Sequence, residues 1–335
     1  MREVLPGIYQ MRMPLPNSPL GHLNAYVLEG DDGWALIDTG WDFPGAFSSA
    51  KRQLKEKGID LDAISQIFIT HVHVDHYGLI GRLKEASGAS TAFHEKEAAF
   101  LSKMAASELE FSALMELQLT ENGMSLRETS GLDFILDVGG TLIYPLDPPD
   151  KILRDGDRIS IGRFNFEVIW TPGHSEGHVC LYEPDKRVLL SGDHILPTIT
   201  PNINVYPFSE NDPLRSYLAS LKRVEKLPVH LILPAHEDVF EGLQQRVGEI
   251  TSHHKERTRH IMKALLGEAK TAYQIALELP WTLNSITGEK ASFVDLDAFG
   301  KVMATGETLA HLQYLRGEGK VKMESCEGTN VYRGA

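Results

Sequence analysis

The sequence predicts a mixed α+β protein, and two observations carry this prediction. Several short apolar segments rich in β-branched residues each stop at a motif containing His or Asp, which is typical of strands that end at a site. The last quarter of the chain instead shows helical periodicity and closes with a hairpin pattern. We therefore expect a catalytic part built on sheets, over 1–246, and a small C-terminal part over 247–335.

Four predicted strands lead directly into the polar motifs. They cover residues 64–70, 164–170, 187–190 and 230–233. The motifs that follow them are T-H-V-H-V-D-H at 70–76, T-P-G-H-S-E-G-H at 171–178, S-G-D-H at 191–194 and P-A-H-E at 234–237. Groups at strand ends are held by a rigid sheet and remain open to substrate, so this is where a site is expected.

The spacing within the first motif divides its ligands between two metals. His71 and His73 alternate, so an extended backbone can turn both to one side. Asp75 and His76 follow where the chain bends into a helix predicted to start near 77–78. Neutral imidazole and carboxylate suit zinc and its neighbours in the first transition row, and iron and manganese tolerate them too. The motif thus predicts half of a dinuclear site.

An insertion separates the first and second motifs, at about 94–149. Its first part, 95–117, predicts one helix with Phe100, Met104, Phe111 and Met115 among its apolar residues, and 125–136 predicts a second helical piece. These helices either pack on the sheets or on a second subunit, or they arch over the metals and form an apolar acyl pocket. Both arrangements are compatible with the pattern.

The C-terminal part predicts three helices and a hairpin. The helices are expected at 247–266, 271–279 and 305–318, and the hairpin turns around Glu327 and Gly328. This order resembles a winged-helix domain. Winged helices often bind nucleic acid, but residues 248–335 contain 11 Lys and Arg against 11 Asp and Glu, so the whole net charge of −13 lies in 1–247. A structural or dimerising role is therefore favoured over nucleic-acid binding.

Composition points to a protein of the cytoplasm. No apolar run in the 335 residues reaches the length of a membrane span, and the N-terminal residues lack the apolar centre of a secretion signal. Cys180 and Cys326 are far apart and are expected to be free thiols. Neither a nucleotide-binding glycine motif nor a G-x-S-x-G nucleophile motif occurs.

Together with L-I-D-T-G at 36–40, the four motifs resemble those of the metallo-β-lactamase fold superfamily over about residues 1–245. The resemblance implies an αββα sandwich with the site at one edge of two facing sheets. It implies that His71, His73 and His174 hold a first metal, that Asp75, His76 and His236 hold a second, and that Asp193 bridges them. The bridging aspartate places the chain nearer to the thioesterase, lactonase, phosphodiesterase and ribonuclease branches than to the β-lactamases.

Residues around these ligands are expected to support the site or contact the substrate. Asp38 and His178 are expected to orient ligands or their loops. His22 is a candidate to overhang the site, and the loop at 202–210 is a candidate to rim it with Tyr206 and Phe208. The remaining histidines are expected to be surface or packing residues, with His194 close to the site but not a ligand. They are His94, His230, His253, His254, His260 and His311.

The expected activity is metal-dependent hydrolysis, with two divalent ions, zinc foremost, activating a bridging hydroxide. Asp75 and Asp193 are the expected catalytic carboxylates. The favoured substrate is a small carboxylic ester or thioester, such as an acyl-CoA. The alternatives are a metal-dependent endoribonuclease or phosphodiesterase and a binding protein with a vestigial site.

Overall fold

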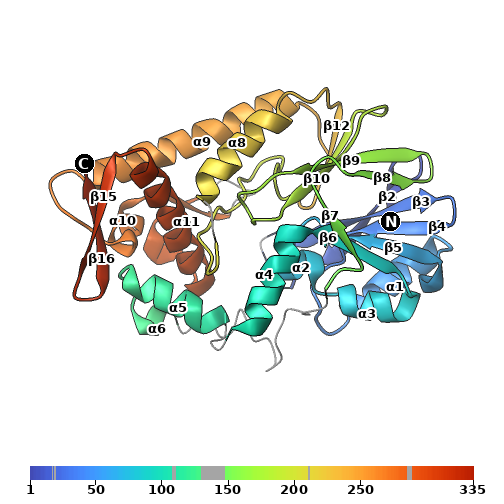
Figure 1. The fold of residues 1–335 in the computed structure, drawn as a ribbon, viewed down its shortest axis with the longest axis horizontal. Helices are drawn as coiled ribbons and strands as arrows, with labels where there is room; N and C mark the ends of the chain where they lie inside the picture. The colour runs from blue at the N-terminus through green and yellow to red at the C-terminus, as the bar shows by residue number, and fades with distance from the viewer. Residues whose placement is uncertain (17, 19, 108–110, 130–147, 210–211, 285–288) are drawn as a thin grey trace.

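The computed structural model describes residues 1–335 except 17, 19, 108–110, 130–147, 210–211 and 285–288. Two sheets face each other and helices cover their outer sides, as Figure 1 shows. The first sheet has the order β1-β2-β3-β4-β5-β6-β7. Its strands are β1 (Arg2–Leu5), β2 (Ile8–Pro14), β3 (His22–Gly30), β4 (Gly33–Ile37), β5 (Ile64–Phe68), β6 (Ser90–His94) and β7 (Lys151–Leu153).

The second sheet has the order β12-β11-β10-β9-β8. Its strands are β8 (Arg158–Ile161), β9 (Phe164–Trp170), β10 (Val179–Glu183), β11 (Val188–Gly192) and β12 (Leu231–Pro234). The pairs β4–β5, β5–β6, β6–β7 and β11–β12 are parallel, whereas β8, β9, β10 and β11 form an antiparallel meander. The predicted αββα sandwich is therefore confirmed, and three of the four predicted ligand-bearing strands match β9, β11 and β12 closely.

Alternating side chains fill the spaces between the layers. On β10, Leu181 faces the other sheet, whereas Cys180 and Tyr182 face the helices outside the second sheet. On β4, Ile37 likewise faces between the sheets and Leu36 faces outward. Both faces of these strands are buried, which explains why their sequences read as continuous apolar runs.

The outer helices complete the sandwich. Helices α1 (Ala46–Glu56) and α3 (Ile80–Ser87) cover the first sheet, and α8 (Pro213–Val224) and the start of α9 (Leu243–Ala264) cover the second. The short helix α2 (Val74–Tyr77) lies between β5 and α3. Asp75 and His76 are therefore inside a helix that begins at Val74, earlier than the predicted start near 77–78, because His73 already has the extended backbone of an N-cap.

The insertion forms three described helices, α4 (Glu95–Ala106), α5 (Phe111–Glu121) and α6 (Leu126–Thr129). The prediction of one helix over 95–117 was wrong, because Ser107 leaves the helical conformation with ψ of 134°. Most of the second predicted piece, 125–136, lies outside the described residues. Helix α4 packs beside β6 and β7, whereas α5 and α6 pack on the C-terminal helix α11, as both views show.

The C-terminal part contains the three predicted helices and the predicted hairpin in the predicted order, and it has a further strand pair, β13–β14, that was not predicted. After α9 come α10 (Ala272–Glu278), the pair β13 (Trp281–Asn284) and β14 (Glu289–Ala291), α11 (Ala298–Gly317), and the hairpin β15 (Val321–Cys326) and β16 (Thr329–Gly334). Short 3-10 turns occur at Leu61–Ala63 and Phe293–Asp295. Helix α11 begins seven residues before the predicted start at 305, because Asp297 caps it by accepting from the Gly300 amide at 2.7 Å.

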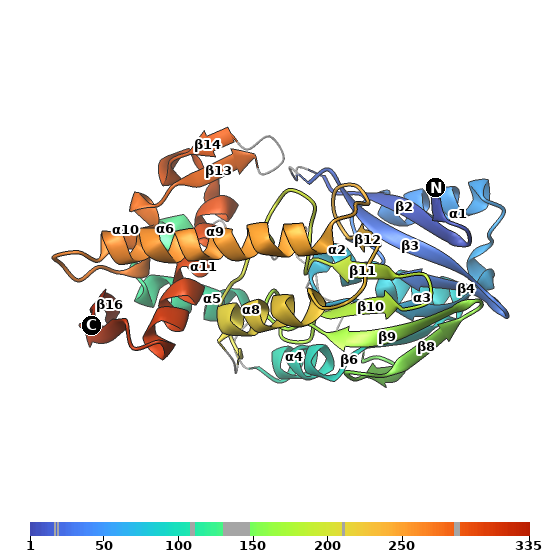
Figure 2. The same cartoon turned by 90° about the horizontal axis from the view of Figure 1, so that it is seen from above.

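The junction between the two predicted parts falls inside one helix. Helix α9 runs through positions 246 and 247 without a break and connects the sandwich to the C-terminal helices, as Figure 2 shows. Its Val247 and Ile250 pack with the second sheet, whereas Ile261 and Ala264 pack in the C-terminal cluster. None of the described helices is long and apolar enough to cross a membrane.

Candidate metal centre

The ends of four strands bring the predicted ligands together at one edge of the sandwich. Ligand atoms lie within 4.8 Å of one another in three overlapping groups. The groups are His71, His73 and His174; His71, His76 and Asp193; and Asp75, His76 and His236. The first and third groups match the two sets implied by the resemblance, and the second connects them through Asp193.

The two carboxylate oxygens of Asp193 face different histidines. Its Oδ1 lies 3.5 Å from Nε2 of both His76 and His236, and its Oδ2 lies 3.4 Å from Nε2 of His174. On the other side of the site, Asp75 Oδ2 lies 3.3 Å from His236 Nε2. Asp193 is therefore placed between the two sets of side chains, as a bridging carboxylate would be.

Four potential ligand atoms of this site have no hydrogen-bond partner within the protein. The Nε2 atoms of His76, His174 and His236 and the Oδ1 atom of Asp193 are buried without a hydrogen-bond partner. Such atoms are costly unless something binds them. Ligands at about 2.0–2.1 Å from a tetrahedral zinc ion lie about 3.3–3.4 Å apart, close to the separations above. The donor set of imidazoles and carboxylates is also the one that such ions prefer.

The opposite ring nitrogens of three histidines are held by acceptors. His76 Nδ1 donates to Asp38 Oδ2 at 2.9 Å, and His174 Nδ1 donates to the Asn202 carbonyl at 2.7 Å. His236 Nδ1 donates to the His22 carbonyl at 3.1 Å. Each contact places the proton on Nδ1, so that Nε2 can offer a lone pair to a metal.

Asp38 joins β4 to the first motif. It is buried, and its backbone adopts a positive φ of 59°. Its Oδ1 accepts from the Thr70 amide at 2.8 Å, and its Oδ2 accepts from the Thr70 hydroxyl at 2.9 Å and from His76. These are the contacts that a carboxylate orienting His76 would make.

His178 contacts the chain beside the bridging position. Its Nε2 accepts from the Asp193 amide at 3.1 Å, so its Nδ1 carries the proton and donates to the Thr171 hydroxyl at 2.7 Å. Gly192, with φ of 50°, packs so closely on this ring that a Cβ there would overlap it. His178 thus holds the loop that carries Asp193, and it is not in any of the three ligand groups.

The electrostatic surroundings divide the imidazoles of the site into two sets. Burial lowers the pKa of His73 to about 3 and also depresses the pKa of His71 and His174, so these rings are neutral. Burial acts in the same direction on His236, but the carboxylates of Asp193 and Asp75 outweigh it and raise its pKa to about 10. The same carboxylates, with Asp38, raise the pKa of His76 well above its usual value.

Of the side chains predicted to contact the substrate, that of Tyr206 packs beside a proposed ligand. Its ring centre is 5.7 Å from that of His73. His22 contributes its carbonyl to His236, and its side chain is not among the residues that line the adjacent cavity. Phe208 adopts a positive φ of 70° and does not line that cavity either, although its neighbour Ser209 does.

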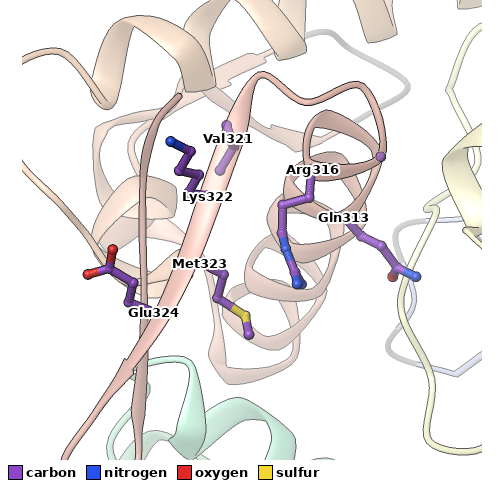
Figure 3. Close-up of a pocket in the computed structure, with 7 residues that line it drawn as sticks. Gln313, Arg316, Val321, Lys322, Met323 and Glu324 are labelled. Carbon is purple, nitrogen blue, oxygen red and sulfur yellow. The ribbon is translucent and has the colours of Figure 1, made fainter.

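The adjacent cavity is small and mostly apolar. It has a volume of about 30 Å³ and opens beside His73, and α4, α5 and nearby loops supply its walls. Its lining residues are Val72, His73, Glu97, Phe100, Phe111, Ser175, Glu176, Tyr206 and Ser209. A larger groove of about 610 Å³ lies between α11 and β15, lined by Gln313, Arg316 and Lys322 among others, far from the ligands in sequence (Figure 3).

Sequence reasoning missed Glu97, a buried carboxylate that joins two ligand loops. Its Oε2 accepts from the amide of Val72, between His71 and His73, at 3.2 Å. Its Oε1 accepts from the Ser175 hydroxyl at 2.6 Å and the Gly177 amide at 2.7 Å. The charged start of α4 resembles a solvated first turn, so only the unusual burial of Glu97 marks it.

The fold and this ligand arrangement define a metal-dependent hydrolase. The profile of the metallo-beta-lactamase superfamily matches residues 19–236, so the chain belongs to that superfamily. A probable metallo-hydrolase, YqjP, of Bacillus subtilis is 26% identical over 97% of both chains. An atrochrysone carboxyl ACP thioesterase of Aspergillus fumigatus is 27% identical over 72% of this chain and 59% of its own length.

Solved structures resemble this chain over its whole length. A metallo-beta-lactamase family protein from Thermus thermophilus is 28% identical, with a TM-score of 0.80 over 99% of this chain and 100% of the other. A beta-lactamase domain protein from Burkholderia ambifaria is also 28% identical, with a TM-score of 0.80 over 100% of this chain and 94% of the other. The C-terminal elements are thus part of a shared arrangement.

Proposed function

We propose that this hydrolase cleaves a carboxylic ester or thioester and that the acyl group enters the cavity beside His73. The observation that carries this proposal is the lining of that cavity. Val72, Phe100 and Phe111 give it apolar walls, and among the described residues no Lys or Arg lines it. Such walls suit an acyl chain and offer no cationic side chain to a phosphodiester. The thioesterase among the relatives supports the same substrate class.

Seven side chains would hold two divalent ions, in two groups on either side of the bridging Asp193. His71, His73 and His174 would bind one ion; Asp75, His76 and His236 would bind the other. When bound, the ions would polarise the scissile carbonyl and acidify water near neutral pH. Zinc is the ion that this donor set favours first, and the same ligand types also admit iron and manganese.

The protein itself orients the ligands and contributes a hydrogen-bond donor. Asp38, the Asn202 carbonyl and the His22 carbonyl hold three imidazoles in the tautomer that leaves Nε2 free. Asp75 and Asp193 keep negative charge at the reacting position. Burial acts to raise the pKa of each carboxyl, but the neighbouring imidazoles outweigh this effect and lower it. Tyr206 lies beside His73, where its hydroxyl would donate to the oxyanion that develops on the carbonyl.

The experiment is a hydrolysis screen of the metal-loaded full chain. Acetyl-, butyryl- and octanoyl-CoA are compared with a lactone, bis(p-nitrophenyl) phosphate and single-stranded RNA, and Asp193→Ala serves as the inactive control. We expect turnover of acyl substrates that disappears in the control. Turnover of the phosphodiester or RNA without turnover of any acyl substrate would contradict the proposal and favour the endoribonuclease alternative.

A further inference from the structure

The loop that follows Asp193 reaches from a proposed metal ligand to the C-terminal helix α11. His174 Nδ1 donates to the carbonyl oxygen of Asn202 at 2.7 Å. The Asn202 side chain extends the other way, and its Nδ2 donates to the Met303 carbonyl and to Glu307 Oε2, both at 3.3 Å. Two consecutive contacts therefore connect α11 to the ring of His174.

The acceptor on α11 is itself held in place. The side chain of Glu307 is only 12% exposed, and Arg257 Nε on α9 lies 3.4 Å from its Oε1. The geometry is that of an ion pair without a directed hydrogen bond, since Oε1 has no hydrogen-bond partner. Arg257 is fixed in turn, because it donates to the Pro280 carbonyl at 2.7 Å and stacks on Trp281 at 4.1 Å.

Close packing holds the same loop against α11 and α5. Asn204 is buried against Gly306, where any Cβ would overlap the asparagine side chain. In addition, Gln118 Nε2 on α5 donates to the Val205 carbonyl at 2.7 Å. The loop is thus held by the insertion and by the C-terminal part together, which limits the positions that the Asn202 carbonyl can take.

We propose that Asn202 and its partner Glu307 are positioning residues for His174, so that α11 contributes to metal binding at the site. Residues that orient a ligand from outside commonly change metal affinity by about 10- to 100-fold when they are removed. Neither residue touches a ligand through its own side chain, and the effect passes through the backbone of the loop. The inference concerns metal binding and does not depend on which bond the enzyme cleaves.

The test compares Asn202→Ala, Glu307→Ala and Glu307→Gln in the full chain, with Glu318→Ala as the control. Glu318 also joins α11 to the sandwich, through Arg215 at 2.9 Å, but does not contact the loop. Zinc affinity is measured by competition with a chromogenic chelator, and the ligand geometry is followed by the visible spectrum of the cobalt-loaded protein.

We expect zinc affinity to fall roughly 10-fold or more in Asn202→Ala and Glu307→Ala, with an altered cobalt spectrum. Glu307→Gln keeps an acceptor for Asn202 and should bind zinc within about 2-fold of the parent, as should Glu318→Ala. The double variant should be no weaker than the worse single variant, because both changes break the same connection.

Three results would overturn the inference. One is unchanged zinc affinity in Asn202→Ala. This variant alone tests the proposal if Glu307→Ala does not fold. Another is an equal loss in Glu307→Gln and Glu307→Ala, which would indicate that the ion pair with Arg257 matters and the contact with Asn202 does not. The third is full additivity of the two alanine changes.

Discussion

Asp38 Oδ2 lies 2.9 Å from His76 Nδ1, although the two residues are 38 positions apart and come from the end of β4 and from α2. The contact is buried on both sides. It couples the first sheet directly to one of the proposed ligand groups. Asp38 contacts Nδ1 of His76, whereas Nε2 is the atom that would bind the metal, so the carboxylate orients the ligand without being one.

The first prediction concerns this pair. Asp38→Asn should lower zinc affinity about 10- to 100-fold. Both oxygens of Asp38 accept hydrogen bonds, so an amide would place an NH2 group against either Thr70 or His76. Chelator competition measures the change, and Asp42→Asn, at an exposed partner of Arg82, is the matched control. Equal zinc affinity in the two variants would rule out an orienting role for Asp38.

The second prediction concerns stoichiometry. Purified and fully loaded protein should contain about two metal ions per chain, as a two-metal site requires. Asp193→Ala should lose metal and hydrolysis while keeping its secondary structure, because Asp193 faces histidines of both groups. Elemental analysis and circular dichroism provide the measurements. Asp238→Ala, which only breaks a surface pair with Arg12, should keep both ions. One ion or none in loaded parent protein would refute the dinuclear site.

The third prediction concerns pH. In the metal-free protein the pKa of His236 is about 10 and that of His76 is also raised, so both rings are protonated near neutral pH. A metal needs their lone pairs, so binding should release up to about two protons and weaken as pH falls. Calorimetry in buffers of different ionisation enthalpy counts these protons. Binding without proton release near neutral pH would contradict the assignment.

The same raised pKa values predict how the metal-free protein responds to pH. Because the folded pKa exceeds the unfolded value of about 6.5, the stabilisation is complete below that pH. It should be lost progressively as pH rises from about 6.5 to about 10. Denaturant unfolding of the metal-free chain across this range checks the direction, and a rise in stability with pH would show that the sign is wrong.

The fourth prediction concerns the acyl cavity. Tyr206→Phe should lower kcat more than it raises KM, because an oxyanion contact strengthens in the transition state. Phe111→Ala should mainly raise KM, and exposed Phe299→Ala should change neither constant. Each buried methylene contributes about 0.8 kcal/mol, so kcat/KM should rise with acyl length and level off early in a cavity of about 30 Å³. No dependence on acyl length would remove the cavity from the proposed function.

The sequence was most informative where apolar strands stop at polar motifs. Strand β9 and the motif that follows it were predicted from residues that are neighbours in the chain, and so was the alternation of His71 and His73. Such features can be predicted from sequence because the periodicity of the backbone determines to which side of a strand each side chain points. The boundaries of α2 and α11 were less visible, since each depends on the conformation of a single capping residue.

The residues that support the site were harder to predict because their contacts span long stretches of chain. Asn202 acts through its backbone carbonyl, which any residue type possesses, so nothing in its identity marks the contact with His174. Glu97 sits on a helix whose charged first turn resembles a solvent-exposed one. Only the three-dimensional arrangement shows that its carboxylate accepts from Val72 and Gly177.

Helix α9 has a practical consequence for exchanging parts between relatives. Its buried Arg246 donates to the Leu196 and Ile199 carbonyls at 2.6 Å each, and its far end packs in the C-terminal cluster. A chimera joined between 246 and 247 would build α9 from two parents. Val247 and Ile250 would then have to pack against a sheet that comes from the other parent. A chimera that takes the sandwich, α9 and α11 from a single parent keeps the native contacts between the sandwich and the C-terminal helices. The segment to be exchanged as a whole is therefore larger than the sandwich alone.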